Sequence, residues 1–383
     1  MMESRMGVPV RQKGGYQAFI PKSLPPDPPL RFDDELQYLL SEADRALARL
    51  DGMASVLPNA DLFVAMYVKK EALLSAQIEG TQASLKGVLE FEADMIPTDD
   101  PAEVREVINY IRAMDHGLAK GPEERFSLDI LLEIHRILLE KTRGGKPEPG
   151  KIRTIQNWIG PPGSTLYSAV FIPPPPERVQ ELLEQLHGFI VADDRIPPLI
   201  RIGLVHAQFE TIHPFLDGNG RMGRLLITFY LCGKGILARP LLYLSIYLKQ
   251  HRDEYYALLQ GIRFEGDWEA WLKFFLKGII DVSNEALATA KEIITLKGYL
   301  IDLLVEHDTG GMSAVRLLDL LFARPVITVA DITSSLGISH QPAYDLVTKF
   351  EELGILREIS GKKRYRKYLF VEYVRIIERG TAI

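Results

Sequence analysis

The chain has 383 residues, of which 46% are hydrophobic and 25% are charged. These values are typical of a globular protein and exclude a disordered, fibrous or membrane-embedded chain. The 45 Lys and Arg residues against 51 Asp and Glu residues give a net charge of −6, so any site for a polyanion must be local. At roughly 100 to 200 residues per domain, the length predicts two or three domains.

The cellular setting is indicated by cysteine content and hydropathy. Cys232 is the single cysteine, so an internal disulfide and a cysteine metal cluster are both excluded. The opening MMESRMGVPVRQKGG contains no apolar core of signal-peptide length. No later run approaches the roughly 18 apolar residues of a membrane helix. We therefore expect a cytoplasmic protein with no membrane partner.

The first two thirds of the chain are expected to be mainly helical. Prolines in residues 21–30 predict an extended lead-in, with regular structure beginning after it. Apolar residues at helical spacing predict a helix from Asp33 to about Leu50. Segment 150–176, with its Pro-Pro-Gly turn, β-forming residues and four consecutive prolines, predicts a loop or short hairpin. Further helices are expected at about 61–79, 102–118, 127–142, 177–192, 198–212, 219–233, 252–262 and 267–298.

The C-terminal part has a different pattern. Two short helices are expected at 326–336 and 339–353, separated by Gly337. The following ILREISGKKRYRKYLF predicts a hairpin with its turn near Gly361. Two helices joined by a tight turn and followed by a β wing indicate a winged helix-turn-helix.

This C-terminal unit is a candidate for DNA binding. Residues 324–368 contain eight Lys or Arg residues against five Asp or Glu residues, and Tyr365 lies among the cations of the wing, a pattern compatible with phosphate-backbone contact. The residues that open the second helix, where a recognition helix reads bases, are Ser339, His340, Gln341 and Tyr344. Because many winged helices bind protein instead, both kinds of partner remain open.

The segment 213–224, HPFLDGNGRMGR, contains the groups that nucleotide chemistry requires. Gly218 and Gly220 flank Asn219, so the backbone can point several N–H groups at one anion. The helix that follows presents its positive end to the same place. Arg221 and Arg224 are three residues apart, so both guanidinium groups could bind one polyphosphate.

Two further residues of this segment could act on the bound phosphates. Asp217 is an oxygen ligand suited to Mg²⁺ that is shared with phosphate. His213 could accept a hydroxyl proton. A lone histidine or glycine pair is usually structural, but here base, metal ligand and anion site occur together. Pro214, Phe215 and Leu216 are expected only to shape the turn and to pack.

This segment resembles the Fic signature H-x-F-x-D/E-G-N-G-R-x-x-R, which is met at each specified position. The sequences around 151–160 and 169–179 resemble the flap region of that family. The resemblance implies a mainly α fold with a Fic-type helical core and a short β-hairpin flap, flanked by an N-terminal helical regulatory segment and a C-terminal winged helix-turn-helix. The domain bounds expected are 1–120, 121–285 and 290–383.

The resemblance also implies an activity: transfer of AMP from ATP to a Ser, Thr or Tyr hydroxyl of a target protein. His213 would be the base, and Asp217 would bind Mg²⁺ on the α- and β-phosphates. A flap at about Ser164 to Ile172 would bind the target peptide by strand addition; the alternative is an ordinary surface loop. Tyr247 is a weak candidate for the adenine pocket and otherwise a core residue. The expected phosphate-binding residues are Gly218, Asn219, Gly220, Arg221 and Gly223, with Arg224 on the γ-phosphate.

Residues 75–80, SAQIEG, match the family's inhibitory pattern S/T-x-x-x-E-G/N. Ser75 and Glu79 are four apart on one helical face, and Glu79 lies in the last turn, where its carboxylate meets the negative end of the helix and calls for a cation. The resemblance implies that Glu79 pairs with Arg224 and occupies the γ-phosphate position. The alternative is a solvated glutamate at a helix end.

Two classes of function follow from these features. The first is an AMP transferase inhibited by Glu79, with ATP and a protein as partners. The second is a DNA-binding transcriptional regulator whose Fic core senses a nucleotide. Within the enzyme class, transfer of another phosphate-containing group and removal of AMP are further alternatives. A homodimer is possible.

Overall fold

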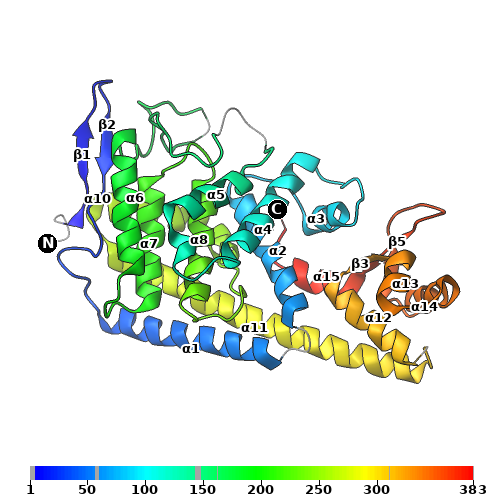
Figure 1. Cartoon of the computed structure of the whole chain (residues 1–383). Helices are drawn as coiled ribbons and strands as arrows, with labels where there is room; N and C mark the ends of the chain where they lie inside the picture. The colour runs from blue at the N-terminus through cyan, green and yellow to red at the C-terminus, as the bar shows by residue number, and fades with distance from the viewer. Residues whose placement is uncertain (1–4, 57–59, 143–147, 162, 310, 383) are drawn as a thin grey trace.

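The structure is a computed structural model that describes residues 5–56, 60–142, 148–161, 163–309 and 311–382. Helices make up most of it, with two small antiparallel sheets (Figure 1). The helices are α1 (Asp34–Val56), α2 (Ala60–Ile78), α3 (Leu85–Glu92), α4 (Pro101–Leu118), α5 (Leu128–Leu138), α6 (Pro176–Val191), α7 (Pro198–Ile212), α8 (Asn219–Gly233), α9 (Ser245–Gln250), α10 (Arg252–Glu265), α11 (Trp268–Glu306), α12 (Gly311–Ala323), α13 (Val329–Leu336), α14 (His340–Glu352) and α15 (Val371–Glu378), with a 3₁₀ turn, η2, at Glu124–Phe126. The predicted mainly α fold is confirmed.

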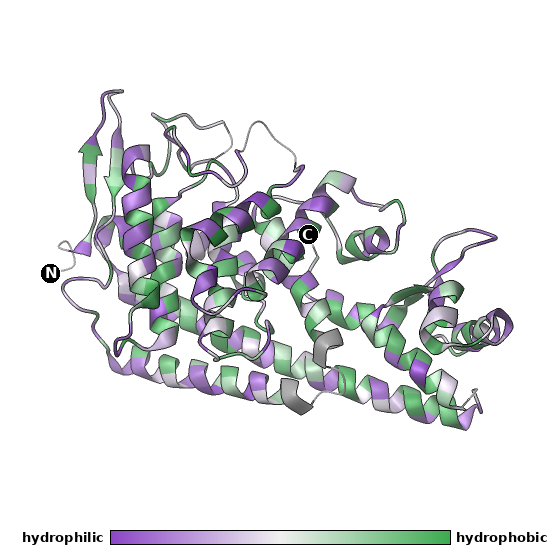
Figure 2. Ribbon diagram, viewed as in Figure 1, coloured by the Kyte–Doolittle hydropathy of each residue, from purple (hydrophilic) through white to green (hydrophobic). Residues whose placement is uncertain are grey.

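Helices α1 and α11 lie side by side along one edge of the molecule (Figure 1). Leu36, Leu39 and Leu47 are buried, as the periodicity of α1 requires, and Figure 2 shows hydrophilic and hydrophobic residues alternating along this helix. Helix α11 has 39 residues and begins after Asp267, whose side chain accepts a hydrogen bond from Ala270 N. It runs unbroken through residues 285–290, where a domain boundary was expected, so the three domain ranges stay a prediction.

Helices α7 and α8 form the centre of the core. Almost every residue of both is buried, because α6 packs against α7, while α2 and α4 pack against α8. Pro198 occupies the first turn of α7, where its missing N–H costs nothing. The signature segment connects these two helices, so its position is fixed by the most deeply buried part of the chain.

Strands β1 (Val8–Arg11) and β2 (Gln17–Ile20) form a hairpin before the proline-rich segment. The expectation that regular structure begins after residue 30 was therefore wrong. The hairpin is fixed by its contact with the predicted flap: Phe19 N donates to Ile172 O at 2.9 Å, and the Phe19 ring packs edge-on against Phe171. The flap itself is a loop closed by one β-bridge between Ile159 and Phe171.

The C-terminal unit is a winged helix-turn-helix, as predicted. Strands β3 (Val326–Thr328), β4 (Leu356–Glu358) and β5 (Lys367–Phe370) form a sheet in the order β3-β5-β4. The first three residues of the helix expected at 326–336 are strand β3, because Thr328 and Asp331 form a capping box that starts α13 only at Val329. Gly337 (φ 69°) ends that helix.

Helices α3, α9, α12 and α15 were not predicted from the sequence. Helix α3 lies beside α2, and α12 joins α11 to the winged helix (Figure 1). Within the described residues, no helix combines the length and the hydropathy that a bilayer crossing requires.

Candidate active site

The loop between α7 and α8 is shaped by two residues with left-handed backbone. His213 (φ 49°) ends α7 and Gly218 (φ 78°) precedes α8. The Asn219 side chain closes the loop: its Oδ1 accepts from Phe215 N at 2.9 Å, and its Nδ2 donates to Phe215 O at 2.9 Å. Because this side chain is bonded inside the loop, the backbone N–H of Asn219 is the group expected at the anion site.

His135 on α5 positions the loop between α7 and α8. The sequence did not indicate this role. The Nδ1 of His135 accepts from Gly150 N at 2.9 Å, so its Nε2 carries the proton and donates to Asp217 O at 3.0 Å. The ring stacks on Phe215 with centroids 3.7 Å apart. Burial lowers the pKa of His135 to about 4, so this neutral tautomer persists near pH 7.

Arg153 and Asn157 position the loop from the other side. Arg153 is buried, and its Nε donates to His213 O at 2.9 Å. Asn157 Nδ2 donates to Phe215 O at 2.8 Å. Both residues lie in KIRTIQNWIG, which the sequence analysis associated with the flap region, but their contacts with the loop depend on tertiary structure.

His213 is a neutral imidazole in this environment. Its Nδ1 lies 3.4 Å from Glu210 O, an acceptor, so this nitrogen carries the proton and Nε2 has the free lone pair. Burial, together with the cations Arg263 and Arg153, lowers the pKa of His213 to about 3. The ring is therefore able to accept a proton at any pH near neutrality.

Asp217 presents a half-exposed carboxylate beside the start of α8. Its Oδ1 accepts from Gly218 N at 2.6 Å and lies 3.4 Å from Arg221 Nη2. Across the described part of the chain, no three His, Cys, Asp or Glu side chains are grouped as a metal site. Mg²⁺ bound with a nucleotide needs only one or two carboxylates, since phosphates and water supply the rest. Asp217 therefore fits an ion of that kind.

Arg221 has donors that no protein group uses. The side chain is buried, and its Nε and Nη1 make no hydrogen bond. Nη1 lies 3.6 Å from Glu106, an ion pair beyond hydrogen-bond distance. A buried polar group without a partner is costly, so the first turn of α8 presents a cation suited to an added anion.

Arg224 is held by residues at the end of α2 through its Nε and Nη2. Its Nε donates to Ser75 Oγ at 2.7 Å, and its Nη2 donates to Ser75 O at 2.9 Å and to Glu79 Oε1 at 2.6 Å. The two residues singled out in SAQIEG are thus both brought to Arg224. Partial burial opposes ionisation of Glu79, but Arg224 and then Arg221 lower its pKa below the usual value, so the contact is an ion pair.

Gly220 lets the Glu79 carboxylate approach the start of α8. A Cβ atom at Gly220 would lie 2.2 Å from Glu79 Oε1 and 3.0 Å from Arg224 Nη1. Gly223 serves packing instead, because a Cβ atom there would lie 2.5 Å from Glu210 Oε1 on α7. Its expected part in nucleotide binding stays a prediction.

Family models match three stretches of the chain. The Fic/DOC family N-terminal model matches residues 37–119, the Fic/DOC family model matches residues 125–231, and a model of an HTH DNA binding domain matches residues 315–368. The second match contains the whole segment from His213 to Arg224. The chain belongs to the Fic/DOC family.

Curated relatives of this Fic/DOC protein include protein adenylyltransferases. The protein adenylyltransferase fic-1 of Caenorhabditis elegans is 30% identical over 208 residues, which are 52% of this chain and 37% of that protein. The protein adenylyltransferase Fic of Culex quinquefasciatus is 28% identical over 248 residues, 63% of this chain and 45% of that protein. The chain thus spans less than half the length of either relative.

Solved structures share the fold of this Fic/DOC protein. A Fic family protein from Desulfovibrio desulfuricans G20 aligns with a TM-score of 0.58 and 21% identity, covering 90% of this chain and 98% of that one. Residues 134–508 of Fic-1 from C. elegans align with a TM-score of 0.51 and 24% identity, covering 68% of this chain and 74% of that one. At these identities the likeness concerns the fold alone.

Tyr247, the weak adenine candidate, is a buried residue of α9 in this Fic/DOC protein. Its ring lies 4.4 Å from the His251 ring and 5.0 Å from the Phe274 ring. A Cβ atom at Gly278 would lie 2.6 Å from it, so the ring is tightly packed against α11. These contacts suit a core residue, and its role toward adenine stays a prediction.

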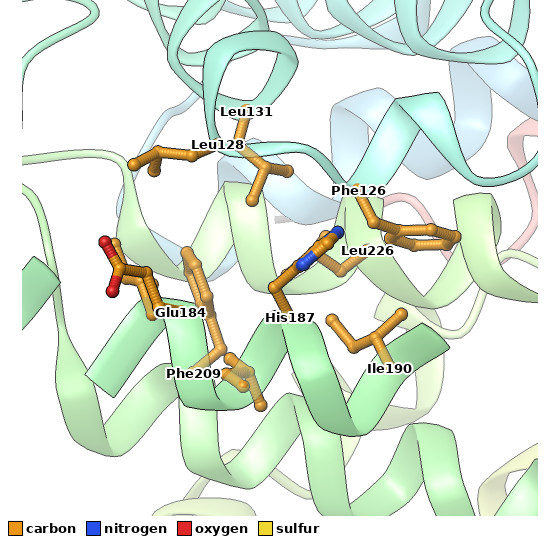
Figure 3. A pocket seen from close by; sticks show the side chains of 10 residues that line it. Phe126, Leu128, Leu131, Glu184, His187, Ile190, Phe209 and Leu226 are labelled. Carbon is orange, nitrogen blue, oxygen red and sulfur yellow. The ribbon is translucent and has the colours of Figure 1, made fainter. Parts of the chain in front are cut away.

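An apolar pocket of about 120 Å³ lies between α5, α6, α7 and α8 of this Fic/DOC protein (Figure 3). Glu184 and His187 of α6 line it together with apolar side chains, among them Phe209 and Leu226. None of its ten lining residues is Lys or Arg. It is therefore unsuited to a triphosphate, unlike the start of α8.

Proposed function

We propose that the protein transfers AMP from ATP to a Ser, Thr or Tyr hydroxyl of a target protein, and that Glu79 inhibits this transfer. The observation that carries the proposal is the set of groups at the start of α8. Arg221 has two buried nitrogens without hydrogen-bond partners, Arg224 is occupied by a carboxylate, and a neutral His213 lies in the adjoining loop. Together they suit a polyphosphate and a hydroxyl nucleophile.

His213 is the proposed general base. Its Nε2 takes the hydroxyl proton as the target oxygen bonds to the α-phosphorus of ATP. The bond from that phosphorus to the oxygen bridging the β-phosphate breaks, and pyrophosphate leaves. Glu210 O and Arg153 orient the imidazole and its backbone, so the lone pair keeps a fixed direction.

Arg221 and the first turn of α8 are proposed to stabilise the charge that develops on the phosphate oxygens. Free N–H groups at a helix start and a preorganised guanidinium act without reorganising during the reaction. Asp217 would bind Mg²⁺, which supplies charge neutralisation on the phosphates when it is bound.

Glu79 is proposed to inhibit because its carboxylate occupies the position of the γ-phosphate of ATP. While Nε and Nη2 of Arg224 are engaged by Ser75 and Glu79, they are not available to a γ-phosphate. The carboxylate also fills the space beside Gly220, where a phosphate would contact the helix start. ATP could then bind only without its productive γ-phosphate contact.

The predicted flap is proposed to bind the target. Tyr167 and Val170 are exposed there, and the segment is fixed at its base by the bridge between Ile159 and Phe171. An extended target peptide could add to this edge by backbone hydrogen bonds.

The decisive experiment incubates the Glu79→Gly variant with lysate, Mg²⁺ and ATP labelled at either the α- or the γ-phosphate. Relative to the same lysate without the variant, whose own kinases use γ-labelled ATP, we expect added label on protein only from α-labelled ATP, and an AMP adduct on a hydroxyl side chain by mass spectrometry. Added label from γ-labelled ATP alone would indicate phosphoryl transfer and contradict the proposal, as would the absence of any added label.

The pH dependence should report the neutral histidine. For the Glu79→Gly variant, kcat/KM for AMP transfer should stay level between about pH 8 and 5.5, because the pKa of His213 is lowered to about 3 and the ring remains a base throughout. A base with the ordinary histidine pKa of about 6.5 would lose about tenfold by pH 5.5. A loss of that size would contradict the assigned environment of His213.

A second function, DNA binding, is favoured by the exposed face of the winged helix. Ser339, His340, Gln341 and Tyr344 are exposed at the start of α14, and Lys363 and Arg364 are exposed on the wing. A recognition helix presents this end to base edges, and a basic wing contacts phosphates.

A salt-dependent shift assay tests this second function. Replacing both Lys363 and Arg364 by alanine should weaken binding to any duplex and reduce the slope of log K against log salt by about 2. Lys13→Ala, which removes an exposed cation far along the chain, is the matched control and should leave the slope unchanged. Equal slopes for the control and the double variant would contradict wing contact with DNA.

A further inference from the structure

Segment 379–382 follows α15, the last helix of the winged helix unit, and returns to the end of α2. Thr381 O accepts a hydrogen bond from Gln77 Nε2 at 3.1 Å, and Ala382 O accepts one from Lys249 Nζ at 2.7 Å. Lys249 Nζ also donates to Gln77 Oε1 at 2.8 Å. The segment is therefore tied to α2 both directly and through Lys249 on α9.

These bonds end on the same turn of α2 that contacts Arg224. Gln77 lies between Ser75 and Glu79, the two residues that bind the Arg224 guanidinium. Residues two apart on a helix point to different sides, so this turn meets Arg224 with one side and segment 379–382 with another. A shift of this turn caused by one contact, with Arg224 or with segment 379–382, is therefore expected to change the other contact.

Close packing fixes the segment against the protein. Gly380 has φ 78°, and a Cβ atom there would lie 2.5 Å from the Ile246 side chain on α9. Thr381 is buried and its N–H donates to Glu378 O. Arg379 makes a paired contact with both oxygens of Glu292 on α11. Segment 379–382 is thus closely packed between α2, α9 and α11.

The winged helix unit packs against α2 through α12 and α15, and a cleft lies beside this contact. The cleft, of about 590 Å³, lies between α2 and α3 on one side and the β3 region on the other, and Lys69, Asp94, Arg324 and Lys367 are among its lining residues. An interface that encloses such a polar cleft is of the kind that permits relative domain movement. Movement of α15 would pull directly on segment 379–382.

We propose that segment 379–382 holds the last turn of α2 in its inhibitory position, so that displacement of the winged helix unit weakens the contact between Glu79 and Arg224. This inference rests on the proposed AMP transfer and names how that site is regulated. Loss of the one hydrogen bond that joins the segment directly to α2, from Gln77 Nε2 to Thr381 O, should shift the equilibrium toward the uninhibited form by about fivefold.

The test uses Gly380→Val, whose side chain would collide with Ile246 and displace the segment without altering α2. The matched control is Gly361→Val, where φ is also positive (62°) but nothing surrounds the added side chain on the wing. We expect AMP transfer to rise about fivefold in Gly380→Val and to be unchanged in the control. A chain ending at Glu378 should show the same rise and guards against a folding defect in the valine variant.

The same variants are then made with Glu79→Gly. No further rise is expected there, because the inhibitory carboxylate is already absent. An equal rise in both backgrounds, or no rise from either Gly380→Val or the shortened chain, would overturn the proposal.

Amide hydrogen exchange separates this inference from the proposed function. The amides of Glu79 and its neighbours on the last turn of α2 should exchange about fivefold faster in Gly380→Val than in the Gly361→Val control. This readout needs no catalysis, so it tests the inference even if the Glu79→Gly variant transfers no AMP. Unchanged exchange in that turn would overturn it.

Discussion

Replacing Glu79 by glycine is expected to raise AMP transfer about tenfold or more. A hydrogen bond to a charged group contributes about 1.5 to 3 kcal/mol, and the Glu79 side chain is 36% exposed, which places its contact with Arg224 near the lower end of that range. Removing the carboxylate frees both the Arg224 guanidinium and the space beside Gly220. The measurement is initial-rate labelling from α-labelled ATP at saturating Mg²⁺.

Two companion variants separate charge from helix geometry. Glu79→Gln keeps the side-chain size and should still raise transfer, because it removes the charge that competes with phosphate. Ser75→Ala removes only the acceptor of Arg224 Nε and should raise transfer by about fivefold. Equal labelling by the wild type and all three variants would refute inhibition by this turn.

Replacing His213 by alanine in the Glu79→Gly background should lower transfer at least about a hundredfold, the usual contribution of a positioned general base. Nucleotide affinity, measured by calorimetry, should change by less than about threefold, because the proposal gives the imidazole no phosphate contact. The Glu79→Gly background is needed because inhibition by Glu79 in the wild type would hide the loss of AMP transfer.

His187→Ala is the matched control for this loss. That histidine lies on α6 beside the apolar pocket and outside the signature loop (Figure 3), so its replacement should leave transfer unchanged. Turnover retained by the His213→Ala variant would remove this residue from the role of base.

The sequence was most informative where the chemistry is local. Residues 213–224 are close along the chain, so a motif alone indicates that His213, Asp217 and the two arginines lie together, in the loop and at the start of α8. Helical periodicity likewise located α7 and α8, because both are long and regular. The meeting of Glu79 with Arg224 spans 145 residues, and it was expected only through a family resemblance.

The residues that position the loop could not be found in this way. His135 and Arg153 act through backbone carbonyls of Asp217 and His213, and a hydrogen bond to a carbonyl leaves no pattern in the sequence of the acceptor. The β1–β2 hairpin was missed for a related reason. Its strands have four residues each and gain their stability from contact with the flap, which local propensity does not record.

Under the proposed function, inhibition by Glu79 and affinity for ATP both depend on the absence of a side chain at Gly220. A methyl group there would exclude the glutamate and, by the same reasoning, any phosphate that takes its place. Variants that escape control by mutation at this glycine would therefore lose their nucleotide as well. Under the proposed function, variants that lose inhibition but keep their nucleotide are therefore expected from changes at the end of α2 or at the residues that hold it, and not from changes at Gly220.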